Sequence, residues 1–235
     1  MHLYFDIGGT NFRYYILDEY HKQHGMFIQI REQNIFDQLF STLQKIFLEI
    51  DFIISITVSI AGAVQNNSIY GVNNISIEDG THLMTTFTGI PIRYVNDGDA
   101  YLLGELYLKK NIVESYSNVL AIIFGTGVGC GLYINNTLVS NAEIYQYMEK
   151  YMKNNVLTED NIDKVTDFIS KQLRKFIIFL NLHAVIIGGY VNKYDNFEYL
   201  IKQKINLPEM YNTDIIISKS TDSILRGLVQ YRLYY

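Results

Sequence analysis

Two short segments of glycine and threonine, about half a chain apart, constrain the fold of this sequence most strongly. The first is Asp6-Ile7-Gly8-Gly9-Thr10, and the second is Phe124-Gly125-Thr126-Gly127-Val128-Gly129. Each segment lies between two runs of strand-forming residues, and this repetition indicates a duplicated fold. Glycine has no side chain in the way and tolerates positive φ, so such turns let backbone N–H groups approach a phosphate closely. We therefore expect a nucleotide-phosphate site between two related lobes.

The rest of the chain alternates between strand-like and helix-like patterns, which predicts an α/β fold. Further strands are expected at residues 26–30, 52–58, 92–95, 184–187 and 215–217, and helices at 36–50, 100–109, 142–153, 160–179 and 221–231. No Pro/Ser-rich linker separates the halves, so they should pack as lobes about a cleft. We expect an N-terminal lobe at 1–112, a C-terminal lobe at 113–220, and a final helix (221–235) that packs on the first lobe.

Composition narrows the class of protein. With 24 acidic and 19 basic residues the formal charge is −5, which disfavours nucleic acid as a partner. The sequence shows no secretory signal and no apolar run of membrane-spanning length, so we expect a cytoplasmic protein with no membrane partner. One cysteine, Cys130, and five scattered histidines predict no zinc site.

Two common phosphate-binding motifs do not fit. In a G-x-G-x-x-G fingerprint the last glycine would fall on Cys130, and a hairpin rather than a helix should follow. A P-loop needs Gly-Lys-Ser/Thr, which does not occur in the sequence.

Asp97 is the best catalytic candidate. It follows a predicted buried strand and precedes a predicted helix, within Asn96-Asp97-Gly98-Asp99. A carboxylate there could accept a proton from a substrate hydroxyl at the mouth of a cleft. The local sequence fits equally well a helix in which Asp97 or Asp99 serves only as the N-cap.

Two other positions have both a functional and a structural interpretation. Asp6 ends the first strand beside the glycines, where a carboxylate commonly serves a hydrated Mg²⁺, but it could be a turn aspartate that bonds its own backbone. Gly188-Gly189 ends a late buried strand and could let a nucleotide base approach the backbone, or could form a simple turn.

Taken together, these motifs resemble the ROK family of sugar kinases and related repressors, in the superfamily of actin, hexokinase and the heat-shock ATPases. The resemblance covers five segments in order: Asp6–Asn11, Ser59–Val64, Val95–Glu105, Gly125–Leu132 and Val185–Gly189, with Arg226-Gly227-Leu228 in the closing helix. It implies a two-lobed actin-like (ribonuclease H-like) ATPase fold with a cleft between the lobes.

The resemblance also implies roles for individual residues. Asp97 would be the general base that deprotonates a sugar hydroxyl, and Asp6 would serve Mg²⁺ through water. The ATP and phosphate contacts would be Gly8, Gly9, Thr10, Asn11, Gly125, Thr126, Gly127, Gly188 and Gly189. The sugar contacts would be Gly62, Asn74 (or its neighbour Asn73), Asn96, Asp97 and Glu143.

The sequence departs from the family in one region. The family usually has Gly-Glu-x-Gly-His and a cysteine-rich zinc segment after the second phosphate motif. Here that place is taken by Ala142-Glu143-Ile144-Tyr145-Gln146, so the zinc-ligand histidine is replaced and the cysteines are absent. The stretch between Gly129 and Gly188 is also short for the family, so the sugar pocket has lost one wall or been rebuilt.

The leading functional prediction is an ATP- and Mg²⁺-dependent kinase of a sugar or amino-sugar hydroxyl, with a homodimer left open. The altered pocket favours a rival, a non-catalytic or regulatory binding protein of the same fold. A kinase of another small alcohol is a third alternative. The pantothenate-kinase type usually shows Asp-x-Gly-Asn-Thr, and Gly9 argues against it.

Overall fold

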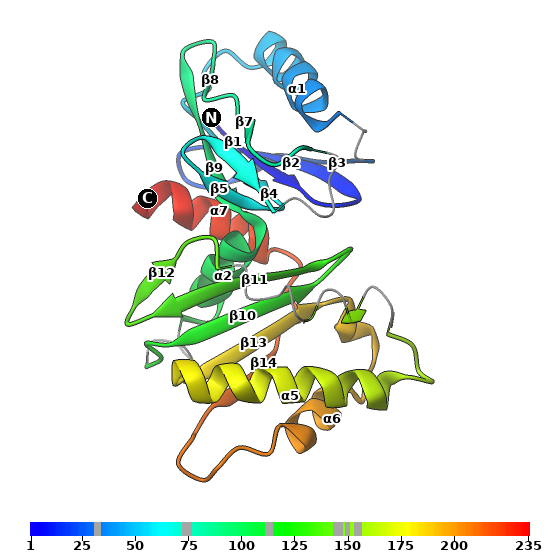
Figure 1. Cartoon of the computed structure of the whole chain (residues 1–235). Coiled ribbons are helices and arrows are strands. Elements are labelled where there is room, and N and C mark those ends of the chain that lie inside the picture. Colours follow the sequence, from blue (N-terminus) through cyan, green and yellow to red (C-terminus); the bar gives the residue numbers. More distant parts are fainter. Residues whose placement is uncertain (31–33, 72–76, 111–114, 143–147, 149–150, 153–156) are drawn as a thin grey trace.

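The computed structural model describes residues 1–30, 34–71, 77–110, 115–142, 148, 151–152 and 157–235 (Figure 1). Two sheets lie one above the other in Figure 1, with two helices between them. The helices are α1 (Ile35–Glu49), α2 (Asp97–Leu108), α5 (Ile162–Leu180), α6 (Phe197–Ile205) and α7 (Ser223–Tyr234), with one 3-10 turn, η1 (Tyr190–Lys193). None of the helices in the described ranges is both long enough and apolar enough to span a membrane.

The upper sheet has six strands in the order β3-β2-β1-β4-β9-β8. β1 is antiparallel to β2 and parallel to β4, which is parallel to β9. The strands are β1 (His2–Ile7), β2 (Asn11–Leu17), β3 (Gln23–Ile30), β4 (Ser55–Ile60), β8 (Thr86–Phe87) and β9 (Ile90–Asn96). A small three-stranded sheet comprises β5 (Ala63–Gln65), β6 (Ser68–Tyr70) and β7 (Thr81–His82).

The lower sheet has five strands in the order β12-β11-β10-β13-β14. Its first strand in sequence, β10, is antiparallel to the next strand and parallel to β13, so its order and directions repeat those of β3-β2-β1-β4-β9. The strands are β10 (Val119–Phe124), β11 (Val128–Ile134), β12 (Thr137–Val139), β13 (Ala184–Gly189) and β14 (Asp214–Ile217). The duplication predicted from the two glycine segments is therefore confirmed at the level of topology.

Each sheet has its own amphipathic helix. On α1, Ile35, Leu39 and Leu43 are buried against the apolar side chains of β1 and β4. On α5, the buried residues Val165 and Ile169 and the following apolar turns cover β10 and β13. The helical spacing of apolar residues seen in the sequence is thus the spacing of the buried face.

The helices α2 and α7 pack against each other between the two sheets (Figure 1). Leu225, Leu228 and Val229 of α7 join Tyr4 and Val95 of the upper sheet in one apolar cluster. Tyr101 and Leu102 of α2 belong to a cluster with strands of the lower sheet. The proposed division of the chain at residue 112 stays a prediction.

The structure corrects several predicted boundaries. The helix predicted to begin at Ala100 begins at Asp97 instead. The strand predicted from Phe52 begins at Ser55, and Phe52 is 81% exposed rather than buried. The short strands β5 to β8 and helix α6 were not predicted. Most of the helix expected at 142–153 lies outside the described residues.

Candidate active site

The first turn of α2 brings four polar residues to the interface between the sheets. Asn96 is the N-cap: its Oδ1 accepts hydrogen bonds from the backbone N–H of Gly98 (2.9 Å) and of Asp99 (3.1 Å). Its Nδ2 donates to the carbonyl of Gly62 at 3.0 Å. The alternative in which Asp97 or Asp99 caps the helix is therefore wrong, because a third residue does so.

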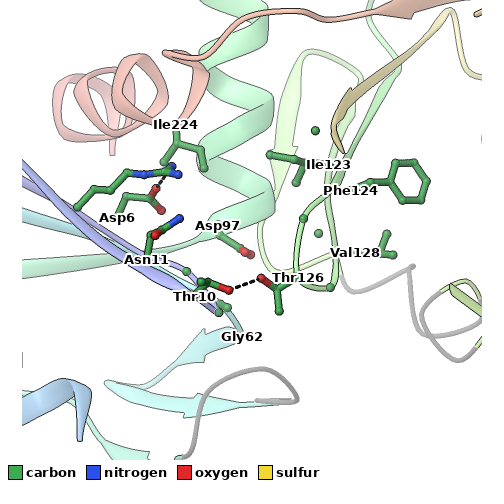
Figure 2. Close-up of a pocket in the computed structure, with 18 of the residues that line it drawn as sticks. Asp6, Thr10, Asn11, Gly62, Asp97, Ile123, Phe124, Thr126, Val128 and Ile224 are labelled. Atoms are coloured by element: carbon green, nitrogen blue, oxygen red, sulfur yellow. Dashed lines mark hydrogen bonds and ion pairs between the residues drawn. The ribbon is translucent and has the colours of Figure 1, made fainter. Parts of the chain in front are cut away.

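Asp97 is the first helical residue, and its carboxylate faces a pocket (Figure 2). A Cβ atom on Gly129 would lie 3.6 and 3.7 Å from the two carboxylate oxygens. Burial, and then the nearby charge of Asp6, raises the pKa of Asp97 to about 7. The backbone N–H of Gly98, 2.9 Å from Oδ1, opposes this shift. A carboxylate with such a pKa can exchange a proton near neutral pH.

Both glycine turns line the same pocket, a cavity of about 240 Å³. The first turn joins β1 to β2, and the second joins β10 to β11. The two turns touch: the hydroxyls of Thr10 and Thr126 are 2.9 Å apart, and a Cβ on Gly9 would lie 2.9 Å from the Cβ of Thr126. The predicted phosphate residues among the pocket lining are Gly8, Gly9, Thr10, Asn11, Gly125, Thr126, Gly127 and Gly189.

Asp6 also lines this pocket, and it is only 5% exposed. Its Oδ2 pairs with the guanidinium of Arg13 at 3.2 Å. Burial raises the pKa of Asp6, whereas the charge of Arg13 lowers it. Arg13 was not predicted as a site residue. The hairpin register places it directly opposite Asp6, and that register was the signal that could have found it.

The residues present fit a magnesium ion held mainly by water and phosphate. Among the residues that the structure describes, no three His, Cys, Asp or Glu side chains gather around one metal position. Mg²⁺, however, usually keeps several waters and needs only one or two carboxylates beside the phosphates of its nucleotide. The buried carboxylate of Asp6 beside the first glycine turn meets that requirement.

Gly188 and Gly189 have an internal packing reason to be glycine. A Cβ on Gly188 would overlap the hydroxyl of Tyr101, and one on Gly189 would overlap the carbonyl of Phe124. Gly189 also has φ 91°, which disfavours other residues, and it lines the pocket. The simple-turn alternative does not explain these contacts, and the adenosine role of the two glycines stays a prediction.

The predicted sugar contacts are only partly described. Gly62 lines the pocket and has φ 128°. Asn96 is 3% exposed, and its side chain also caps α2 and holds Gly62. The predicted contacts Asn74 (with Asn73) and Glu143 lie outside the described residues.

Solved structures share this fold over nearly their whole length. A candidate N-acetylmannosamine kinase from Listeria monocytogenes is 19% identical, with a TM-score of 0.82 over 99% of this chain and 98% of that chain. A ROK glucokinase from Streptomyces griseus, solved with glucose and AMPPNP, is 15% identical, with a TM-score of 0.72 over 97% of this chain and 98% of that chain.

A ROK transcriptional regulator, homologous to the MLC protein of Escherichia coli, also matches, with 14% identity and a TM-score of 0.73. That match covers 99% of this chain and 78% of the regulator. At these identities the likeness concerns the fold, which is the two-lobed actin-like ATPase fold expected from the sequence. No curated protein matches the chain. The model of the ROK family matches residues 3–143, which is more than half of the sequence. The chain therefore belongs to the ROK family.

Proposed function

We propose that this protein transfers the γ-phosphoryl group of ATP to a hydroxyl of a sugar or amino sugar, with Asp97 as the general base. The observation that carries the proposal is the position of Asp97: its carboxylate faces a pocket lined by both glycine–threonine turns. One cavity thus presents a proton acceptor and two phosphate-type turns together, which is the combination that phosphoryl transfer to an alcohol requires.

The state of Asp97 supports this role. A general base works best when its pKa lies near the working pH, and the pKa of Asp97 is raised to about 7. The carboxylate would accept the proton of the attacking hydroxyl as that oxygen bonds to the γ-phosphorus. The bond between the γ-phosphorus and the leaving oxygen of ADP breaks in the same transfer.

The two turns would hold the nucleotide on the other side of the pocket. Their glycines leave room for phosphate oxygens, and the hydroxyls of Thr10 and Thr126 can each donate a hydrogen bond. Asp6 would hold Mg²⁺ through water, and the ion would neutralise charge on the transferred group. On the acceptor side, Gly62 and Asn96 would contact the sugar, as would Asn74 and Glu143.

Other attributes of the protein are proposed with less direct support. The net charge of −5 favours a small-molecule substrate over nucleic acid as a partner. A cytoplasmic location would supply ATP and keep the buried thiol of Cys130 reduced. A homodimer stays a prediction.

The proposal is tested by ADP release over a panel of hexoses and N-acetylhexosamines, with Asp97→Asn as the paired control. We expect at least one sugar to release ADP with the native protein and none with the variant. If the native protein binds ATP and a sugar but releases no ADP, the kinase proposal fails. That result would favour the rival, a regulatory binding protein, whose fold the ROK transcriptional regulator shares.

A further inference from the structure

Asn141 links two segments that lie far apart in the chain. It follows β12, and its side-chain amide reaches Val64 in β5, 77 positions earlier. The backbone N–H of Val64 donates to Oδ1 at 2.8 Å, and Nδ2 donates to the carbonyl of Val64 at 3.0 Å. One side chain thus satisfies both backbone groups of one residue, as a neighbouring strand would.

The backbone of Asn141 is fixed as well. Its N–H donates to Oδ2 of Asp99 at 2.8 Å, and Asp99 is only 1% exposed, in the first turn of α2. Asn141 has φ 60°, a left-handed conformation that asparagine tolerates better than most residues. Both the side chain and the main chain of Asn141 are therefore held in one orientation.

The turn that Asn141 holds lies at the candidate active site. Ala61 and Gly62 connect β4 to β5, immediately before Val64, and both line the pocket with Asp97. The carbonyl of Gly62 accepts a bond from Nδ2 of Asn96 at 3.0 Å. The turn is thus tied on one side to the N-cap of α2 and on the other side, through Asn141, to Asp99 of the same helix turn.

We infer that Asn141 is a positioning residue, which fixes the turn at Ala61 and Gly62 relative to Asp97 and so sets where an acceptor hydroxyl lies. The inference rests on the proposed function, because the turn is taken as the acceptor side of the pocket. Small displacements of a bound acceptor reduce transfer strongly, since the reacting atoms must be aligned. The glycine turns of the nucleotide side do not contact Asn141 through any of the hydrogen bonds described above.

The test compares Asn141→Gly with Asn136→Gly. Glycine keeps the left-handed backbone and the bond to Asp99 but removes both bonds to Val64. Asn136 lies in the preceding hairpin with φ 61° and lines no part of the pocket, so its variant is a matched control. For Asn141→Gly we expect the KM for the acceptor to rise about tenfold or more, with the Kd for ATP within about twofold. The control should match the native protein.

The inference is overturned if the acceptor KM of Asn141→Gly is unchanged, or if ATP affinity falls as much as acceptor affinity. A second measurement separates this failure from failure of the proposed function. Hydrogen exchange at the amide of Val64 should be faster in Asn141→Gly and unchanged in Asn136→Gly. If the native protein phosphorylates no acceptor, the kinase proposal fails, while exchange still decides whether Asn141 holds the turn. Unchanged exchange would overturn the inference.

Discussion

The hydroxyl groups of Thr10 and Thr126 lie 2.9 Å apart, although 116 positions separate the two residues in the chain. Each threonine sits in the turn of one of two topologically equivalent hairpins, β1–β2 and β10–β11. The contact closes one side of the pocket that Asp97 faces (Figure 2). Both hydroxyls would have to exchange this mutual bond for phosphate contacts when a nucleotide enters.

Replacing Thr126 with valine should therefore affect nucleotide binding more than stability. Valine keeps the shape of threonine but removes the hydroxyl, and a charge-assisted hydrogen bond to phosphate is worth about 1.5–3 kcal/mol. We expect the Kd for ATP to rise about tenfold or more, measured by calorimetry. The melting temperature should barely change, because the Thr10–Thr126 bond is exposed. Thr137→Val, in the exposed hairpin at β12, is the control and should bind ATP normally. Normal ATP affinity in Thr126→Val would remove this hydroxyl from the phosphate site.

Asp97→Asn should abolish turnover while ATP still binds. An asparagine of the same size cannot accept the proton, and loss of a general base costs about 10²- to 10⁴-fold in kcat. The variant should also be more stable above pH 7. The folded-state pKa of about 7 lies above the ordinary value of 3.8, so the carboxyl destabilises the fold increasingly as pH rises through that window. A near-native kcat would exclude Asp97 from the mechanism, and a loss of stability at pH 8 would contradict the burial argument.

The rate should follow the protonation of Asp97. Only the carboxylate can act as a base, so kcat/KM should fall as pH drops through about 7. Burial is the main cause of the raised pKa and the charge of Asp6 is the second, so Asp6→Asn should move the midpoint of the profile to lower pH. The measurement is a pH–rate profile of each protein between pH 5 and 9. A flat native profile, or a midpoint that moves upward in Asp6→Asn, would contradict this assignment.

The sequence predicted the two sheets because their strands carry strong local signals. Apolar β-branched runs end at glycine or Asn-Asn turns, and Asn135 and Asn136 do adopt positive φ. The missed strands β5 to β8 have two or three residues each, too few for a period to show. The start of α2 was missed because Asp97-Gly98-Asp99 has the composition of a turn. Gly98 is needed there for another reason: a Cβ would overlap the backbone of Cys130.

The candidate site was predicted where its residues belong to compact motifs. Asp97 and the two turns could be named from neighbouring residues alone, and the structure brings them to one pocket. Arg13 and Asn141 could not be named in this way. The role of Arg13 depends on strand register, and that of Asn141 depends on a contact across 77 positions. Such pairings follow from tertiary packing, which single-sequence patterns do not encode.

The packing of α2 on α7 should not tolerate alanine at Gly227. A Cβ there would overlap the carbonyl of Ala100 in α2. Helix propensity alone predicts that Gly227→Ala stabilises the protein by roughly 0.5–1 kcal/mol, whereas overpacking costs about 1–3 kcal/mol. We expect the clash to win, so the free energy of unfolding should fall in urea titrations. Leu233→Ala, at a half-exposed position of the same helix, should cost less. A stabilised Gly227→Ala would show that the two helices can move apart without cost.

Activity should require Mg²⁺, and the purified protein should contain no stoichiometric zinc. Cys130 is buried, and no group of three metal-ligating side chains occurs in the described part of the chain, so a closed tetrahedral zinc site has no evident ligands. The transferred phosphoryl group still needs a divalent cation, and the hard oxygens of Asp6 suit Mg²⁺ through bridging water. Elemental analysis tests the first expectation, and EDTA titration with Mg²⁺ added back tests the second. Because the pairing of Asp6 with Arg13 does not involve the metal, EDTA should abolish turnover without lowering the melting temperature. One zinc per chain would show that the pocket has ligands not recognised here, and turnover that persists in EDTA would contradict the Mg²⁺–ATP mechanism.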